Sequence, residues 1–202
     1  MKLAIFFDTE TTGLPLFKEP SQDPRQPHIV QLAACLVDLE TRKTVASMDV
    51  IVKPEGWNIP DEVAAIHGIT TERALAVGLS EVQVVDMFMC LWSGRTRIAH
   101  NQQFDARILR IALLRHFGEG VAERWTHGDA MCTQILATPI VKAPPTEKML
   151  AAGRTHFKSA NLGECVQHFT GRPLVNAHSA MADVLGCMDV FFAIQDLQKA
   201  AA

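Results

Sequence analysis

Short apolar runs separated by polar turns predict three strands in the first quarter of the chain. Residues 3–7 form an apolar run of the kind found in a central strand that is buried on both faces. Residues 29–38 and 44–53 form two further runs, and the polar turn 39–43 joins them. So short a connection predicts an antiparallel hairpin.

Helical spacing and capping signals dominate the rest of the chain. Pro60 opens a short helix that ends at Gly68, and Ser80-Glu-Val-Gln83 forms a capping box before a helix that reaches Trp92. The remaining elements that we expect are, in chain order, a strand at 96–100, a helix from Asn101 to about His116, a strand at 129–133, a helix capped by Ser159 and a last helix from about Ser179 to Gln198. A hairpin followed by strands that alternate with helices predicts an α/β domain with a mixed sheet.

Two long segments contain no clear helical or strand pattern. Residues 14–28 contain four prolines, and residues 139–158 contain three prolines together with four Lys or Arg against one Glu, a net charge of +3. We interpret both as loops inserted into a single domain that spans residues 1–202. Loops of this length in a compact domain are usually functional or mobile. The basic segment is either an arm that grips a phosphate backbone or a loop that is merely solvated.

Composition excludes several classes of protein. With 48% apolar residues in a chain of 202, the sequence can bury a core and is not that of a disordered protein. A net charge of −3 argues against a partner bound by bulk positive charge. The five cysteines form no C-x-x-C pair, which favours reduced thiols over disulfides or a zinc site. Because no apolar run is long enough for a secretory signal or a membrane span, we expect a cytoplasmic protein that does not contact membranes.

Four carboxylates stand where a surface acid is not expected. Asp8 and Glu10 directly follow the first apolar run, and residues two apart in a strand point to the same side. Asp105 lies on the apolar stripe of its helix, within about 40° of Leu109, and Asp183 shares the apolar face of the last helix. Each acid alone has a plain structural explanation, such as a polar turn, a helix that caps itself or an acid at the positive end of a helix dipole.

Together the four acids predict a metal site. Four carboxylates directed at one core would be too costly without positive charge to neutralise them. Hard oxygen ligands suit two divalent cations such as Mg²⁺ or Mn²⁺ better than zinc, and sites of this kind hydrolyse phosphodiesters. His178 precedes Asp183 by five residues, which is about 140° around a helix, so it belongs on the loop before that helix. From there its imidazole can act as a general base on a metal-bound water.

Three motifs resemble, in chain order, those of the DEDDh 3′–5′ exonucleases. They are Asp8-Thr-Glu-Thr-Thr-Gly13, His100-Asn-Gln-Gln-Phe-Asp105 and His178-Ser-Ala-Met-Ala-Asp183, and Ile66-His-Gly-Ile-Thr70 is similar to a further stretch frequent in one branch. That branch contains the proofreading (epsilon) subunit of bacterial DNA polymerase III and its stand-alone relatives. The resemblance covers residues 3 to about 192. It implies a ribonuclease H-like fold, with a five-stranded mixed sheet, one antiparallel strand and flanking helices.

The resemblance also implies roles for single residues. Asp8, Glu10 and Asp183 would bind one of two divalent ions, Mg²⁺ or Mn²⁺, and Asp8 would hold the second with Asp105 in support through water. His178 would be the general base. Positions that contact the substrate in this family correspond to Thr9, Leu14, Glu62, His67 and Asn101. A sister subtype has Tyr in place of His178, and a chain without Tyr cannot belong to it.

The expected function is that of a metal-dependent 3′–5′ exonuclease that acts on single-stranded DNA ends and releases nucleoside 5′-monophosphates. Activity should rise through pH ~6–8 as the imidazole of His178 loses its proton. A 3′–5′ exoribonuclease or oligoribonuclease is the nearest alternative, because the 2′-hydroxyl decides between DNA and RNA. A non-catalytic nucleic-acid-binding module is disfavoured by the complete set of acids. A scaffold recruited by a polymerase would predict binding that Asp8→Ala leaves unchanged.

The end of the sequence bears on the expected partners. Only about 19 residues follow Asp183, which leaves no room for the extended polymerase-binding tail of a true proofreading subunit. We therefore expect a stand-alone exonuclease, or one recruited loosely to a polymerase or a repair complex. Its main partner would be the 3′ end of a single strand, with DNA favoured over RNA.

Overall fold

One mixed sheet forms the centre of the molecule. The computed structural model describes residues 1–201 and contains a five-stranded sheet of order β3-β2-β1-β4-β5. Its strands are β1 (Leu3–Thr11), β2 (Ile29–Asp38), β3 (Lys43–Ile51), β4 (Thr96–Ala99) and β5 (Ala130–Cys132). β2 runs antiparallel to both of its neighbours, whereas β1, β4 and β5 run parallel to one another. The expected five-stranded sheet with one antiparallel strand is therefore confirmed.

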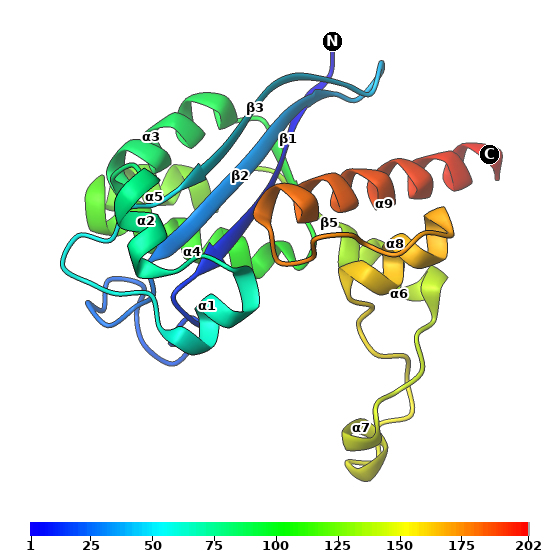
Figure 1. Ribbon diagram of the computed structural model, residues 1–202. Coiled ribbons are helices and arrows are strands. Elements are labelled where there is room, and N and C mark those ends of the chain that lie inside the picture. Colours follow the sequence, from blue (N-terminus) through cyan, green and yellow to red (C-terminus); the bar gives the residue numbers. More distant parts are fainter. Residues whose placement is uncertain (202) are drawn as a thin grey trace.

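Helices cover both faces of this sheet (Figure 1). They are α1 (Asp61–His67), α2 (Thr71–Val77), α3 (Glu81–Trp92), α4 (Gln102–His116), α5 (Glu119–Thr126), α6 (Thr133–Val141), α7 (Glu147–Ala151), α8 (Leu162–Thr170) and α9 (Ala180–Ala200). α3 and α4 pack on one face, and α9 packs on the other with α6 and α8 beside it. No helix in residues 1–201 is long and apolar enough to cross a membrane.

The alternation of side chains along β1 divides the core into two layers. Phe7 is fully buried in a cluster with residues of α3 and α4, whereas Phe6 is fully buried in a second cluster with residues of α9. Burial of one such side chain stabilises the fold by about 1.5–3 kcal/mol. Because the alternation continues beyond the apolar run, Asp8 and Glu10 leave the strand toward α9, and Thr9 leaves it toward α4.

Capping residues fix where two of the helices begin. The side chain of Ser80 accepts the N–H of Gln83, and Gln83 completes the capping box that the sequence predicts for α3. The prediction that Ser159 caps the next-to-last helix is wrong. α8 is capped instead by Asn161, whose side chain accepts the N–H of Glu164 in a second capping box.

Four short helices, α2, α5, α6 and α7, lie where the sequence pattern predicts none, and segment 139–158 is therefore not a single loop. α2, α5 and α6 have seven to nine residues, too few for a clear periodic pattern. α6 continues through Pro139 to Val141, and α7 lies within the segment. Pro139 is two residues from the end of α6, so its missing N–H removes only one helical hydrogen bond. The segment around α7 projects from the body of the molecule as an arm (Figure 1).

Segment 14–28 is an ordered loop that packs against α4. The side chain of Gln26 is 2% exposed, accepts the N–H of Leu16 and donates to the carbonyls of Leu16 and Pro20. Nη2 of Arg107 donates to the carbonyls of Leu16 and Glu19 at 3.1 and 2.9 Å. Side chains thus satisfy the backbone of a loop that has no strand or helix to pair with.

A buried carboxylate joins α3 to the start of β2 and the end of α4. Glu81 is 4% exposed and lies within hydrogen-bonding distance of four groups, the N–H of Ile29, the guanidinium of Arg115 and the rings of His28 and His116. Burial raises the pKa of Glu81, but these hydrogen bonds and the charge of Arg115 outweigh burial and hold the pKa well below its usual range. The contact fixes α4 relative to the strand beside β1.

Candidate active site

The carboxylates at the end of β1 meet the start of α9. Side-chain ligand atoms of Glu10, His178 and Asp183 lie within 4.8 Å of one another. Glu10 comes from β1, His178 from the loop before α9, and Asp183 from the first turn of α9. Residues from opposite ends of the chain therefore converge on one small group of oxygen and nitrogen atoms.

Asp105 approaches the same edge of the sheet from α4. Its side chain is 3% exposed, and Oδ1 accepts both the N–H of Thr9 at 3.0 Å and the hydroxyl of Thr9 at 2.7 Å. These two bonds hold the carboxylate against β1, where its charge acts on Asp8. The structure thus brings together all four acids that the sequence singles out.

Burial and mutual repulsion make these carboxyl groups difficult to ionise. Burial raises the pKa of Glu10 to about 8, with further contributions from the charges of Asp183 and Asp105. Burial raises the pKa of Asp105 to about 7, although the hydrogen bonds from Thr9 act in the opposite direction. The pKa values of Asp8 and Asp183 are also raised, again mainly by burial. Such a group of carboxylates requires a positive charge in its midst.

The ligand atoms fit divalent metal ions. Within residues 1–201, none of the four acids forms an ion pair with Lys or Arg. Oδ1 of Asp183 is buried and has no hydrogen-bond partner. Carboxylate oxygens are the ligands that Mg²⁺ and Mn²⁺ prefer, and an ion here would supply both the missing charge and the missing partner. The residues present therefore suit the predicted ions.

His178 is the exposed member of the group. Its backbone has a φ of 66°, in the left-handed region that residues other than glycine rarely adopt. Its N–H donates to Oδ2 of Asp183 at 3.2 Å, which holds this conformation in place. Left-handed backbone costs roughly 1–2 kcal/mol for such a residue, and strain of this kind is concentrated at functional sites. The conformation leaves the imidazole next to the carboxylates and open to solvent.

Gln31 positions the start of α9 and was not identified from the sequence. It lies opposite Glu10 in the β1–β2 register and is 8% exposed. Its Oε1 accepts the N–H of Ala180 at 3.2 Å, and its Nε2 donates to Oδ1 of Asp49 at 2.6 Å. The first turn of α9, which carries Asp183, is thereby fixed to the sheet. The sequence signal that could have identified Gln31 is that it is a lone amide within the apolar run 29–38.

The residues predicted to contact substrate differ in how accessible they are in the structure. Thr9 is not placed to do so, because it is 5% exposed and both its N–H and its hydroxyl donate to Asp105. Leu14 is 73% exposed, three residues beyond the last residue of β1. Asn101 is exposed and does not cap α4 with its side chain as expected, because its own backbone is left-handed, with a φ of 60°.

α1 brings one of its two predicted residues to the site. His67 ends α1, and its Nδ1 accepts the N–H of Ile69 at 3.2 Å. Burial lowers the pKa of His67. The carbonyl of Thr11 raises this pKa and the charge of His178 lowers it further, and because both groups act on the ring, it lies near the end of β1 and near the loop before α9. Glu62 is exposed in the first turn of α1, about 140° around the helix from His67, and therefore on another face.

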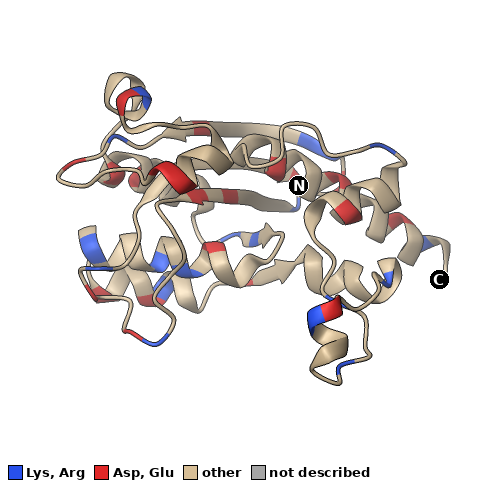
Figure 2. Ribbon diagram, turned by 60° about the horizontal axis from the view of Figure 1, so that its bottom comes forward, with Lys and Arg blue, Asp and Glu red and all other residues tan. Residues whose placement is uncertain are grey.

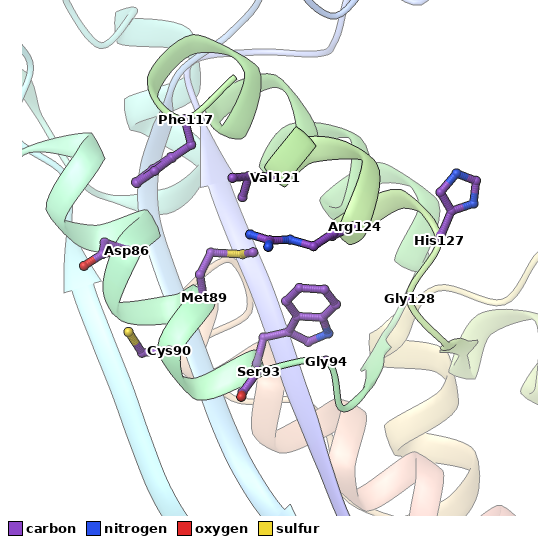
Figure 3. A pocket seen from close by; sticks show the side chains of 11 residues that line it. Asp86, Met89, Cys90, Ser93, Gly94, Phe117, Val121, Arg124, His127 and Gly128 are labelled. Atoms are coloured by element: carbon purple, nitrogen blue, oxygen red, sulfur yellow. The ribbon is translucent and has the colours of Figure 1, made fainter. Parts of the chain in front are cut away.

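Two hollows differ in their relation to the acids. One, of about 470 Å³, is lined by His178, Asp183 and the start of α8 at Asn161. Another, of about 730 Å³, lies between α3 and α5, where Met89 and Arg124 point toward each other (Figure 3). None of the four acids lines the second hollow. The first is therefore the one that can hold part of a ligand beside the carboxylates.

Comparison with known proteins provides a family for the chain. The exonuclease family RNase_T matches residues 5–191. No curated protein sequence matches the chain. E. coli exonuclease I in complex with a dT13 oligonucleotide superimposes with a TM-score of 0.77 at 19% identity, covering 100% of this chain and 42% of that chain. The zinc-bound form of the E. coli exonuclease I complex with single-stranded DNA gives a TM-score of 0.74 at 21% identity, covering 99% and 42%.

The similarity to these structures is one of fold. It agrees with the ribonuclease H-like architecture implied by the three sequence motifs. The chain spans about two fifths of the length of the exonuclease I chains that it matches.

Proposed function

The chain belongs to the RNase_T family of exonucleases, and on this premise we propose that it removes nucleotides from the 3′ ends of single-stranded DNA and releases nucleoside 5′-monophosphates. The observation that carries the proposal is the convergence of Glu10, His178 and Asp183 within 4.8 Å, with the half-buried Asp8 and the buried Asp105 beside them. Four uncompensated carboxylates next to an accessible imidazole suit metal-assisted hydrolysis of a phosphodiester.

Each acid has a place in holding the metal ions. Asp8, Glu10 and Asp183 would hold one Mg²⁺ or Mn²⁺ ion, and Asp8 would hold a second with Asp105 in support. When bound, the ions would lower the pKa of a water molecule and neutralise the charge that develops on the phosphate. Thr9 supports this arrangement, because it fixes the carboxylate of Asp105 with two hydrogen bonds.

His178 would accept the proton of the attacking water. Its imidazole belongs to the same group of ligand atoms as Glu10 and Asp183, within reach of a water molecule held there. Because the side chain is exposed, it can pass the proton to solvent after each cycle. The hydrogen bond from the backbone N–H of His178 to Asp183 keeps the ring at the site.

The choice of DNA follows from the relatives. Structures of E. coli exonuclease I contain dT13 and dA16 oligonucleotides, and those proteins share the fold of this chain. In this chain, the hollow beside His178 and Asp183 would hold the end of the strand. Recruitment to a polymerase or a repair complex would be loose in this view and is not required for the chemistry.

Labelled oligonucleotides test the proposal directly. DNA and RNA oligomers labelled at the 3′ or the 5′ end are incubated with the protein and Mg²⁺ or Mn²⁺, beside an EDTA control and the variant Asp8→Asn. We expect mononucleotides from 3′ ends of single-stranded DNA, slower release from RNA, and none in either control. Internal cleavage, or activity that survives EDTA, would contradict the proposal. Faster release from RNA than from DNA would instead identify an exoribonuclease.

A further inference from the structure

A hollow on the far side of α4 from the acids is lined by basic residues. Gln103, Arg107 and Arg110 stand at positions i, i+4 and i+7 of α4, so they share one face of the helix, roughly opposite to Asp105. Together with Arg97 of β4, the end of α5 and the loop 14–28, they line a hollow of about 410 Å³. The hollow is therefore separate from the carboxylates by about the width of one helix.

The charge of this hollow is not balanced by acids. Its described lining contains three guanidinium groups and the amides of Gln102 and Gln103, and no acidic residue. Glu119 lies 3.7 Å from Arg110, but its side chain is 55% exposed and contributes little through water. Arg107, Arg110 and Arg115 follow one another along α4, whereas over the chain as a whole Lys and Arg alternate with Asp and Glu (Figure 2). An anion in the hollow would meet positive charge on several sides.

Donor groups on the lining residues lack acceptors. Seven buried side-chain polar atoms in residues 1–201 have no hydrogen-bond partner, and four of them are N–H donors on residues that line this one hollow, namely Nε of Arg97, Nε2 of Gln102, Nε of Arg107 and Nε of Arg110. A buried donor without an acceptor costs about 1–3 kcal/mol. Because these four atoms are themselves shielded from solvent, they make the wall of the hollow rich in unpaired N–H groups, while direct contact with a ligand falls to the guanidinium groups that line it.

Two of the guanidinium groups are held in place by the fold. Arg97 donates to the carbonyls of Trp125 and Thr126 at the end of α5 and lies 4.1 Å from the centre of the Trp125 ring. Arg107 donates to the loop 14–28 and lies 5.5 Å from the ring centre of Phe17. Groups fixed in this way lose little conformational entropy when they bind a ligand.

We propose that this hollow binds a phosphate group. Guanidinium groups match phosphate oxygens in geometry and charge, and the exposed amide of Gln103 offers a further donor. The phosphate would come either from the strand, beyond its terminal nucleotide, or from free inorganic phosphate. A phosphate of the strand as the ligand rests on the proposed function. α4 carries Asp105 on one side and this hollow on the other, so a strand that passes around α4 can reach both. Free inorganic phosphate as the ligand does not depend on the proposed function.

A charge substitution at Gln103 tests the proposal without disturbing the fold. Gln103 is exposed in the first turn of α4, where an acidic residue is favourable to the helix. We compare Gln103→Glu with the uncharged control Gln103→Met, and Arg110→Gln with Arg124→Gln, an arginine on α5 that does not line this hollow. Substrates are a thymidine dinucleotide, which offers only the scissile phosphate, and an oligothymidylate of about 12 nucleotides.

The substrate length and added phosphate distinguish the outcomes. For a strand phosphate, Gln103→Glu and Arg110→Gln raise KM about 3- to 10-fold on the longer strand only. The slope of the logarithm of the binding constant against the logarithm of the salt concentration also becomes shallower, by about 0.7 for each lost phosphate contact. For free phosphate, inorganic phosphate raises the Tm of the wild type above that in chloride of equal ionic strength, and the two variants lose this increase without a length effect.

Two results overturn the inference. One is the absence of both effects, and the other is an equal loss of activity on the dinucleotide and the longer strand, which would place these residues in the active site itself. If the wild-type protein releases no nucleotide at all, the proposed function fails, and the measurement with inorganic phosphate still decides whether the hollow binds this anion.

Discussion

Replacing Asp105 with Asn should make the metal-free protein more stable while it reduces activity. The carboxyl of Asp105 is buried beside the other acids, and burial raises its pKa from the ordinary 3.8 to about 7. A group whose pKa is raised by folding stabilises the protein below its ordinary pKa, and this contribution is lost as the pH rises through the folded value. The metal-free protein should therefore lose stability between about pH 4 and pH 7–8.

The size of the effect follows from the two pKa values of Asp105. Raising the pKa from 3.8 to about 7 corresponds to about 4 kcal/mol at pH 8, at 1.36 kcal/mol for each pKa unit. At pH 5 the same group costs only about 1.5 kcal/mol, because most of the titration lies above that pH. In Asp105→Asn, the side-chain oxygen can still accept both hydrogen bonds from Thr9, so the anchor to β1 remains.

Thermal unfolding in EDTA at pH 5 and pH 8 measures the prediction. For a domain of this size, about 4 kcal/mol corresponds to an increase in Tm on the order of 10 °C at pH 8, with a clearly smaller increase at pH 5. Asp86→Asn, which removes an exposed acid of α3, serves as the control and should change the stability by less than about 0.5 kcal/mol. An Asp105→Asn protein that gains nothing at pH 8, or gains equally at both pH values, would refute the reasoning.

The remaining predictions concern the general base, the metal ions and the two positioning contacts. His178→Gln should lower kcat by about 10²- to 10⁴-fold while oligonucleotide binding in EDTA is retained, and equal kcat values would remove His178 from the mechanism. Mg²⁺ or Mn²⁺ should raise the Tm of the wild type at pH 8 and do so much less for Asp8→Asn, as thermal unfolding with and without EDTA would show. Gln31→Leu should reduce kcat by at least about tenfold with metal affinity also lowered, because α9 loses its contact with β2; unchanged metal binding by calorimetry would argue against this. Glu81→Gln should lower the free energy of unfolding, measured in urea at neutral pH, by about 3–5 kcal/mol. The loss should be smaller near pH 4. The reason is that the lowered pKa of Glu81 stabilises the fold above the ordinary value of 4.5, and this contribution fades in acid.

The parts of the fold that local signals control could be predicted from the sequence. The apolar run before Asp8 predicted β1, the Ser80 capping box predicted α3, and the short polar turn predicted the hairpin of β2 and β3. Asp105 and Asp183 could be identified because a carboxylate on an apolar helical stripe violates the pattern of its own helix.

Contacts between distant segments could not be predicted in the same way. The bonds from Thr9 to Asp105 join residues 96 positions apart, and the bond between Gln31 and Ala180 spans 149 positions. The hollow behind α4 likewise depends on where the loop 14–28 packs. No local pattern encodes such distances, because they arise only when the layers pack on the sheet. The assignment of the protein to the cytoplasm stays a prediction.

The two-sided arrangement of β1 couples catalysis to folding through a single register. Phe6, Asp8 and Glu10 belong to one side of the strand, and Phe7 and Thr9 to the other. Deleting or inserting one residue within the apolar run would exchange these sides, sending the acids toward α4 and the aromatic rings to the wrong layers. A shift of this kind would therefore disrupt the active site and the core together, and never one of them alone. The number of residues between the rings and the acids of β1 is therefore set by the sheet, whereas the loops that follow the strand are not bound by this alternation.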